Sequence, residues 1–120
     1  MTKKTLVLGA SLNEARYSNI AIHRLRGKDV PVVAFGLREG AVNDVGIDAV
    51  RKDYENIDTV TLYLNPKRQE EYYDYIISLN PNRVIFNPGT ENIKFEKLLQ
   101  EKGIEAEVAC TLVLLSINQY

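Results

Sequence analysis

The sequence predicts an α/β fold: a mainly parallel sheet of about five strands, with helices covering both faces. Two observations support this prediction. Short apolar runs rich in β-branched residues alternate along the chain with segments in which apolar residues recur at helical spacing. These runs are apolar almost throughout rather than at every second position, which is typical of parallel strands buried on both faces.

The first apolar run, residues 5–8, predicts a strand that ends at Gly9. After a polar turn, helical spacing begins at Ile20 and closes at Gly27, and Ser18 is the expected N-cap. A strand, a glycine turn and a helix in this order present backbone N–H groups to a phosphate, as in a Rossmann-like nucleotide-binding fold. Only one of the three glycines of the dinucleotide fingerprint is present, so the turn indicates an anionic ligand without identifying it.

The remaining elements follow from the same two patterns, except that residues 104–109 alternate apolar and charged residues, which suits an outer strand. Further strands are expected over residues 30–35, 58–64, 83–86 and 104–109, and further helices over residues 66–79, 91–102 and 112–117. Asn65-Pro66 opens the first of these helices as an N-cap with proline at the first helical position, and Gly103 ends the second. Residues 39–56 are the least regular part, and they predict either short edge strands or a poor helix.

Size and composition predict one domain over residues 1–120. A chain of this length has room for one sizeable core but not for separate cofactor and substrate domains. No apolar run approaches the length of a membrane span, and the N-terminus carries no signal-peptide pattern. We therefore expect a cytoplasmic protein without a membrane partner; a homodimer or a complex with a partner protein is compatible with the sequence.

Charge is distributed unevenly along the chain. Residues 1–40 carry seven Lys and Arg against three Asp and Glu, whereas residues 41–120 carry eight against thirteen. The basic surplus surrounds the glycine turn, but it is smaller than a nucleic-acid interface usually needs. It favours a compact phosphorylated small molecule over a nucleic acid.

Four turns are expected on one rim of the sheet, because the carboxyl ends of parallel strands point the same way. Ligands of open α/β sheets bind at this rim. The turns are Gly9-Ala10-Ser11, Phe35-Gly36, Leu64-Asn65-Pro66 and Asn87-Pro88-Gly89. Their convergence predicts a binding site formed by all four.

The end of the second strand indicates the kind of nucleotide. NAD-binding sites place an acidic residue there, on a ribose hydroxyl, whereas the first charge here is Arg38. A phosphorylated ribose fits this corner better, either the 3′-phosphate of CoA or the 2′-phosphate of NADP. Arg16, inside the first turn, has the shape for bidentate phosphate contact, although a surface arginine fits that position equally well. Tyr17 is placed to stack on a ligand.

Nearly the whole chain resembles a known family, most clearly in the motifs of its first and last parts. Gly9-Ala10-Ser11, Asn13 and Arg16-Tyr17-Ser18-Asn19 are similar to the opening of the small stand-alone CoA-binding domains, which resemble the CoA-binding domain of succinyl-CoA synthetase α subunits. Asn87-Pro88-Gly89-Thr90 and the strand running into Cys110 resemble the closing pattern of that family.

The resemblance implies a Rossmann-like three-layer fold with CoA as the cofactor. It places Gly9, Ala10, Ser11, Arg16, Ser18 and Asn19 near the phosphates, and residues 35–38, 64–66 and 88–89 along the adenosine and pantetheine path. The chain departs from the family pattern at two points, because Gly36-Leu37-Arg38 stands where an Asn-Pro turn is usual and Glu14-Ala15 where a proline is usual. The predicted cofactor-binding residues are Gly9, Ala10, Ser11, Asn13, Arg16, Tyr17, Ser18, Asn19, Phe35, Gly36, Arg38, Leu64, Asn65, Pro66, Asn87, Pro88 and Gly89.

The sequence contains no recognisable catalytic set. His23 is the only histidine and is expected at the surface or at a helix cap, and Ser11 lacks the Gly-x-Ser-x-Gly context of a nucleophile. Cys110 is the only cysteine, which excludes a cysteine-based metal site. We expect it to be buried and inert, with a mixed disulfide to the CoA thiol as the alternative.

These observations predict a module that binds CoA or an acyl-CoA through the first glycine turn without catalysing a reaction. The alternative is a small NADP-binding oxidoreductase or a redox-sensing module. A third possibility is an interaction domain in which the glycine turns only make sharp corners.

Overall fold

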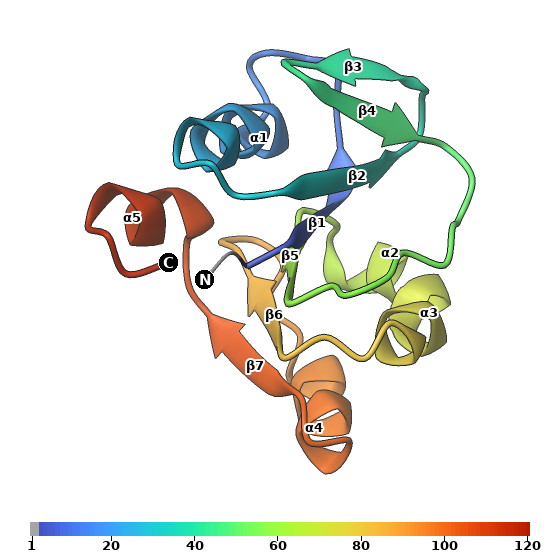
Figure 1. Cartoon of the computed structure of the whole chain (residues 1–120). Helices are drawn as coiled ribbons and strands as arrows, with labels where there is room; N and C mark the ends of the chain where they lie inside the picture. Colours follow the sequence, from blue (N-terminus) through green and yellow to red (C-terminus); the bar gives the residue numbers. More distant parts are fainter. Residues whose placement is uncertain (1–2) are drawn as a thin grey trace.

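Seven strands form one sheet in the order β3-β4-β2-β1-β5-β6-β7 in the structure, a computed structural model that describes residues 3–120 (Figure 1). Within these residues every neighbouring pair is parallel except β3 and β4. The strands are β1 (Thr5–Ala10), β2 (Val32–Gly36), β3 (Gly40–Val42), β4 (Val45–Asp48), β5 (Thr59–Leu62), β6 (Arg83–Phe86) and β7 (Glu105–Val108).

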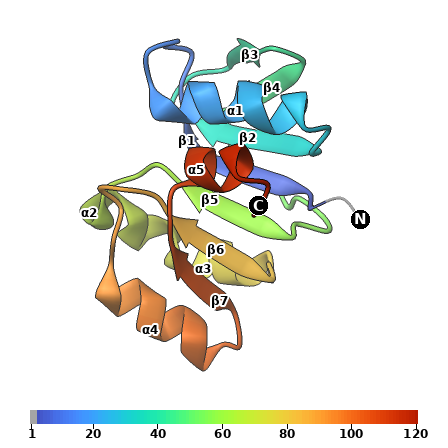
Figure 2. The same cartoon turned by 90° about the vertical axis from the view of Figure 1, so that its left-hand side faces the viewer.

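Helices cover both faces of the sheet, which gives three layers (Figures 1 and 2). The helices are α1 (Tyr17–Gly27), α2 (Pro66–Gln69), the 3₁₀ turn η1 (Glu70–Tyr72), α3 (Tyr73–Ser78), α4 (Ile93–Glu101) and α5 (Thr111–Ser116). Helices α1 and α5 lie on one face, and α2, α3 and α4 lie on the other. None of the helices among residues 3–120 has the length and apolar character needed to cross a membrane.

Two hydrophobic clusters separate these layers. Successive side chains of a strand point to opposite faces, and accordingly Leu6 and Leu8 of β1 belong to the cluster under α3 and α4, whereas Val7 belongs to the cluster under α1 and α5. All three are completely buried. The continuous apolar runs of the sequence therefore serve two cores, as the prediction of a covered parallel sheet requires.

The prediction of the fold class is confirmed, and all five predicted strands are present. The two additional strands come from residues 39–56, where β3 and β4 form an antiparallel hairpin around Asn43 and Asp44. Asn43 has a φ of 56°, a left-handed conformation that asparagine tolerates in two-residue hairpin turns. This stretch therefore contains short strands and not the alternative helix, but only β3 lies at the edge, because β4 lies between β3 and β2.

The start of α1 differs from the prediction. The helix begins at Tyr17, its N-cap residue is Arg16, and no side chain caps it. Ser18, the expected N-cap, lies inside the helix because the chain turns earlier, at Asn13: the Ala15 N–H donates to Asn13 Oδ1 and the Arg16 N–H donates to the Asn13 carbonyl, at 2.9 and 3.0 Å. The polar turn is consequently shorter, and the helix N-terminus lies closer to the end of β1.

The segment after Asn65 is also less regular than predicted. Asn65 caps α2 as expected, because its Oδ1 accepts the Arg68 N–H at 2.9 Å and Pro66 occupies the first helical position. The expected single helix over residues 66–79 is instead divided into α2, η1 and α3. Gly103, with a φ of 75°, follows α4 as predicted.

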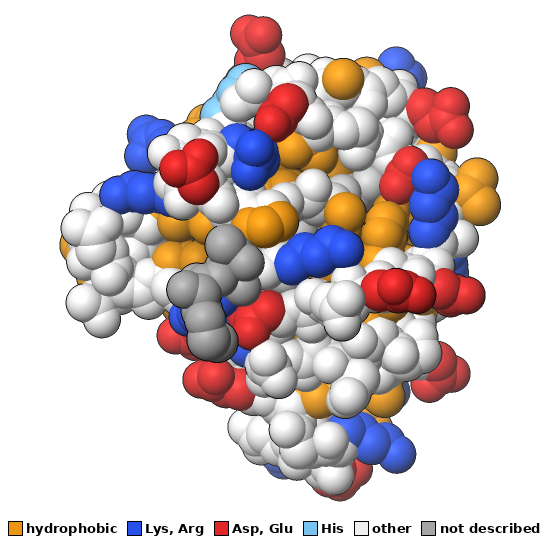
Figure 3. Space-filling model, viewed as in Figure 1, with side chains coloured by type: hydrophobic (Ala, Val, Ile, Leu, Met, Phe, Trp, Pro, Cys, Tyr) orange, Lys and Arg blue, Asp and Glu red, His pale blue; other side chains and the backbone are white. Residues whose placement is uncertain are grey.

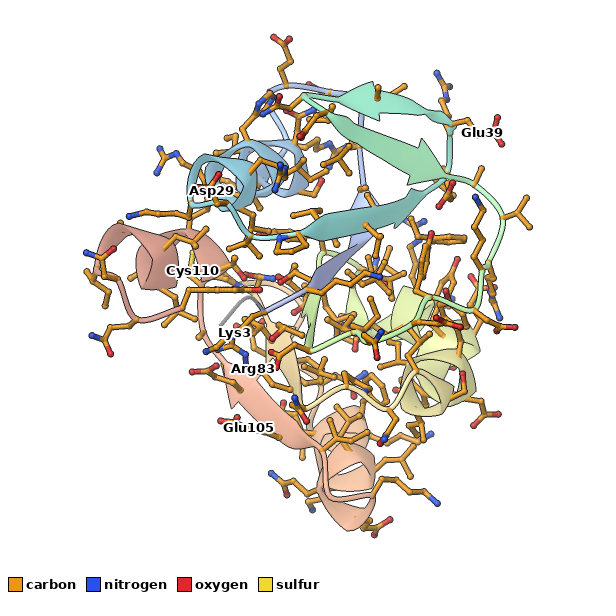
Figure 4. The ribbon with its side chains drawn as sticks, in the orientation of Figure 1. Lys3, Asp29, Glu39, Arg83, Glu105 and Cys110 are labelled. Carbon is orange, nitrogen blue, oxygen red and sulfur yellow. The ribbon has the colours of Figure 1, made fainter. Side chains whose placement is uncertain are left out.

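The end of the chain returns to the start of the sheet. The Tyr120 carbonyl accepts hydrogen bonds from Lys3 Nζ at 2.6 Å and from Arg83 Nη2 at 3.2 Å. Arg83 also pairs with Glu107 of β7 at 3.1 Å. Figure 4 shows Lys3 and Arg83 in the same region, at the amino ends of the strands. On this face acidic and basic side chains are interspersed (Figure 3).

Candidate functional site

A cleft of about 770 Å³ opens at the carboxyl ends of β1, β2, β5 and β6. Figure 2 shows the loops after β1, β5 and β6 at its left side, at the opposite end of the sheet from the N-terminus. The turns after all four strands line this cleft. The turns that the sequence predicts on one rim therefore do lie together.

Most residues of the predicted site line the cleft: Gly9, Ala10, Ser11, Asn13, Arg16, Tyr17, Ser18, Phe35, Gly36, Arg38, Leu64, Asn65, Pro88 and Gly89. Asn19, Pro66 and Asn87 do not line it. Asn19 and Asn87 are almost completely buried, and Pro66 forms the first turn of α2.

Leu37, within the predicted range 35–38, also lines the cleft, and five further residues line it without having been predicted: Leu12, Tyr63, Arg68, Tyr72 and Thr90. The place of Arg68 could have been predicted, because it stands three residues after the Asn65 cap and therefore in the first turn of a helix at the rim. Tyr63 directly follows β5, so its place at the rim also follows from the strand pattern.

The turn between β1 and α1 is held by its own polar side chains. The Asn13 N–H donates to Ser11 Oγ at 3.1 Å, and Asn19 Nδ2 donates to the Ser11 carbonyl at 2.9 Å. Within residues 3–120, the N–H groups of Leu12, Tyr17 and Ser18 have no acceptor. Together with the N-terminus of the eleven-residue helix α1, these free donors are suited to bind an anion.

Two glycines allow the ends of the strands to approach each other at the floor of the cleft. A Cβ atom on Gly36 would lie only 2.2 Å from the carbonyl oxygen of Ala10. Gly9 has a φ of 98°, and a Cβ there would lie 3.0 Å from the backbone carbon of Tyr63. The register between β1 and β2 shifts at this point, between Leu8 and Ala10. The ends of the strands therefore meet backbone to backbone here, with no room for a side chain on Gly36.

The charged side chains that line the cleft are all arginines. Arg16, Arg38 and Arg68 come from the turns after β1, β2 and β5, and each is exposed. No carboxylate among residues 3–120 forms an ion pair with any of them. No aspartate or glutamate lines the cleft. The electrostatic field of the cleft therefore favours an anionic ligand that touches several turns.

Apolar side chains are exposed at the mouth of the cleft. Leu12 is 44% exposed, Tyr17 71% and Leu37 76%. All three come from the turns after β1 and β2, on one side of the cleft. Large apolar groups that are this exposed within a concave surface indicate contact with an apolar or aromatic part of a ligand.

A buried glutamine fixes the opposite wall. Gln69 is completely buried, and its Nε2 donates to the carbonyls of Leu64 and Thr90, both at 2.8 Å. Its Oε1 accepts a hydrogen bond from Asn92 Nδ2 at 3.0 Å. One side chain thus joins the turn after β5 to the turn after β6 behind the cleft.

Asn87 has a similar structural role deeper in the protein. Its Nδ2 donates to Thr61 Oγ1 at 2.7 Å and to the Leu62 carbonyl at 2.8 Å, and its Oδ1 accepts the Thr111 N–H at 2.9 Å. These bonds tie β5, β6 and the start of α5 together. Asn87 therefore supports the rim from behind.

Among three other titratable residues, Tyr63 lines the cleft, whereas Cys110 and His23 do not. Burial raises the pKa of Tyr63, which lines the cleft, to about 12. Cys110 is half-buried, not buried as predicted, and lies between β7 and α5 outside the lining of the cleft (Figure 4). It is the N-cap residue of α5 and follows β7, as the sequence predicted. His23 is exposed on α1, as expected.

Known proteins with the same fold resemble this chain. The sequence profile of a family described as CoA binding domain matches residues 3–116. The crystal structure of an uncharacterized protein is 46% identical and superposes with a TM-score of 0.97, over 100% of this chain and 99% of the other. No curated protein matches the chain.

Two more distant structures share the fold. A Thermus thermophilus protein is 18% identical, with a TM-score of 0.84 over 99% of this chain and 91% of that one. A hypothetical protein from Pyrococcus horikoshii OT3 is 25% identical, with a TM-score of 0.82 over 93% of this chain and 80% of that one.

Proposed function

Because the chain belongs to the family of CoA binding domains, we propose that its cleft binds CoA or an acyl-CoA. The observation that carries this proposal is the charge of the cleft, where Arg16, Arg38 and the N-terminus of α1 converge without any acidic residue in the lining. A ligand with several phosphates spread over more than one turn fits this arrangement. CoA has a pyrophosphate and a separate ribose phosphate.

The pyrophosphate is assigned to the turn between β1 and α1. The free N–H groups of Leu12, Tyr17 and Ser18 and the positive end of the α1 dipole stabilise negative charge there. The Arg16 guanidinium, in the same turn, adds a bidentate partner for the phosphate oxygens.

The order of the strands suggests the course of the ligand. Across the rim the order is β2, β1, β5 and β6. Arg38, after β2, is assigned to the 3′-phosphate, and the exposed apolar groups Leu12 and Leu37 beside it suit the adenine ring. The uncharged pantetheine then runs toward Leu64 and Gly89, after β5 and β6. The cleft volume of about 770 Å³ lies within the range of about 300–1,000 Å³ that is usual for ligand sites.

The lining supports binding rather than catalysis. It contains no histidine, cysteine, lysine, aspartate or glutamate. The phenol of Tyr63, with its pKa raised to about 12 by burial, remains protonated near neutral pH. General acid–base catalysis requires a group with a pKa near the working pH, so the function proposed for this cleft is to hold the cofactor.

Calorimetric titration with CoA, dephospho-CoA, NADP and NAD tests this proposal. We expect CoA to bind and NAD to give no measurable binding heat. Hydrogen bonds to charged groups contribute about 1.5–3 kcal/mol. Arg38→Ala should therefore raise the Kd of CoA by about ten- to a hundredfold but leave the Kd of dephospho-CoA nearly unchanged. Arg16→Ala should weaken both ligands.

Arg24→Ala is the matched control, because Arg24 is an exposed arginine of α1 that does not line the cleft. It should bind CoA like the wild type. Absence of CoA binding, or equal losses in Arg24→Ala and Arg38→Ala, would contradict the proposal. A preference for NADP over CoA would favour the NADP-binding module instead.

A further inference from the structure

Arg68 is the positive group at the side of the cleft where CoA itself carries no charge. It belongs to the turn after β5, whereas Arg16 and Arg38 follow β1 and β2. If the two phosphate positions are those given under the proposed function, the pantetheine and the acyl group pass Arg68. We propose that the cleft selects acyl-CoA thioesters whose acyl group ends in a carboxylate, with the Arg68 guanidinium binding that carboxylate. This inference rests on the proposed binding of CoA.

The position of Arg68 is fixed by the residues on both sides of it. The Arg68 N–H donates to the Asn65 cap at 2.9 Å, and the next residue, Gln69, is buried and bonded to both neighbouring turns. The backbone at Arg68 is thus anchored, while its side chain is exposed and lines the cleft. A guanidinium held at a rigid point is suited to recognise a planar carboxylate.

Within residues 3–120, Arg68 has no partner that would give it a purely structural role. Its guanidinium forms no ion pair with a carboxylate. Arg51, by contrast, pairs with Glu71 at 3.5 Å and lies 4.4 Å from the centre of the Tyr72 ring. Glu91, the acidic residue of the turn after β6, accepts the Gly89 N–H at 2.7 Å and does not line the cleft. The charge of Arg68 is therefore available to a ligand.

Pairs of thioesters of equal chain length test this inference. Succinyl-CoA and butyryl-CoA differ only in the terminal group, as do glutaryl-CoA and pentanoyl-CoA, so each pair isolates the effect of the carboxylate. We expect the wild type to bind at least one of the two acidic thioesters about tenfold or more tightly than its neutral counterpart. Arg68→Gln should abolish this preference and leave the Kd of free CoA within about twofold.

Lys67→Ala is the control, since Lys67 is an exposed neighbour on the same helix that does not line the cleft. It should keep the preference. If the wild type binds CoA but shows no preference within either pair, the inference is wrong while the proposed function stands. If Arg68→Gln weakens free CoA as strongly as the acidic thioesters, Arg68 contacts the pyrophosphate and the inference is again wrong. If no thioester and no CoA bind, the proposed function fails first.

Discussion

The replacement Gly36→Ala tests the close approach of β1 and β2 at the floor of the cleft. The added Cβ would lie 2.2 Å from the Ala10 carbonyl oxygen and 3.3 Å from Cγ2 of Ile47. Unbonded carbon atoms normally keep about 3.5–4.0 Å from their neighbours, so the two strands must separate by about 1 Å at this point. Overpacking of this kind costs about 1–3 kcal/mol, which lowers the Tm of a domain of this size by roughly 4–15 °C.

The same displacement reaches the binding site. Ala10 immediately precedes Ser11, whose carbonyl and hydroxyl organise the first turn. Moving Ala10 should therefore also raise the Kd of CoA, by about tenfold or more if one charged hydrogen bond is lost. Urea unfolding followed by circular dichroism gives the stability, and calorimetry gives the Kd.

Gly46→Ala is the matched control, because Gly46 is also a strand glycine, in β4, and nothing lies within 4 Å of a Cβ added there. This variant should match the wild type or gain up to about 1 kcal/mol, since alanine restricts the unfolded chain. If Gly36→Ala is as stable as Gly46→Ala and binds CoA like the wild type, the argument about strand approach is wrong.

Three further predictions concern buried and titratable groups. Gln69→Leu should lower stability by several kcal/mol, at about 1–3 kcal/mol for each buried partner left unpaired, and should weaken CoA; equal stability would contradict the role of this side chain. The hydrogen bond from Tyr54, and then the contact with Lys52, lower the pKa of Asp48. Wild type should therefore exceed Asp48→Asn in stability at neutral pH, with the difference disappearing as the pH falls below about 4, and a constant difference would refute this. The pKa of Tyr63 is about 12, so its contribution to the free energy of unfolding should be lost as the pH rises from about 10 to 12. In an ultraviolet titration, Tyr63→Phe should show one tyrosine fewer that ionises near pH 12.

The strands were predictable because their signals are local. A parallel strand buried on both faces is rich in apolar and β-branched residues, and residues 5–8, 59–62 and 84–86 satisfy this condition. The hairpin of β3 and β4 escaped a firm prediction because its strands are short and half exposed. The start of α1 was misplaced because Asn13, not Ser18, makes the turn, and both residue types are common at helix N-termini.

The site was predictable as a set of turns but not as a set of side chains. Parallel topology places the ends of β1, β2, β5 and β6 on one rim whatever residues follow them. Whether an asparagine in a turn faces the ligand or the core depends on contacts far away in the sequence. Asn87 bonds to Thr61 and to the Thr111 N–H, twenty-six and twenty-four residues away, and these contacts turn it inward. The Asn65 cap already placed Arg68 in the first turn of a helix at the rim, but the hydrogen bonds of the buried Gln69 that fix α2 are seen only in the folded structure.

The most direct test of the central claim is to map the binding of CoA on the backbone amides by NMR. CoA should shift the amide resonances of Leu12, Ser18, Gly36 and Gly89 most strongly, and the resonances of residues 105–116, in β7 and α5, should change little. Binding with its largest effects on β7 and α5, or no change at millimolar CoA, would contradict the assignment of the cleft as the CoA site.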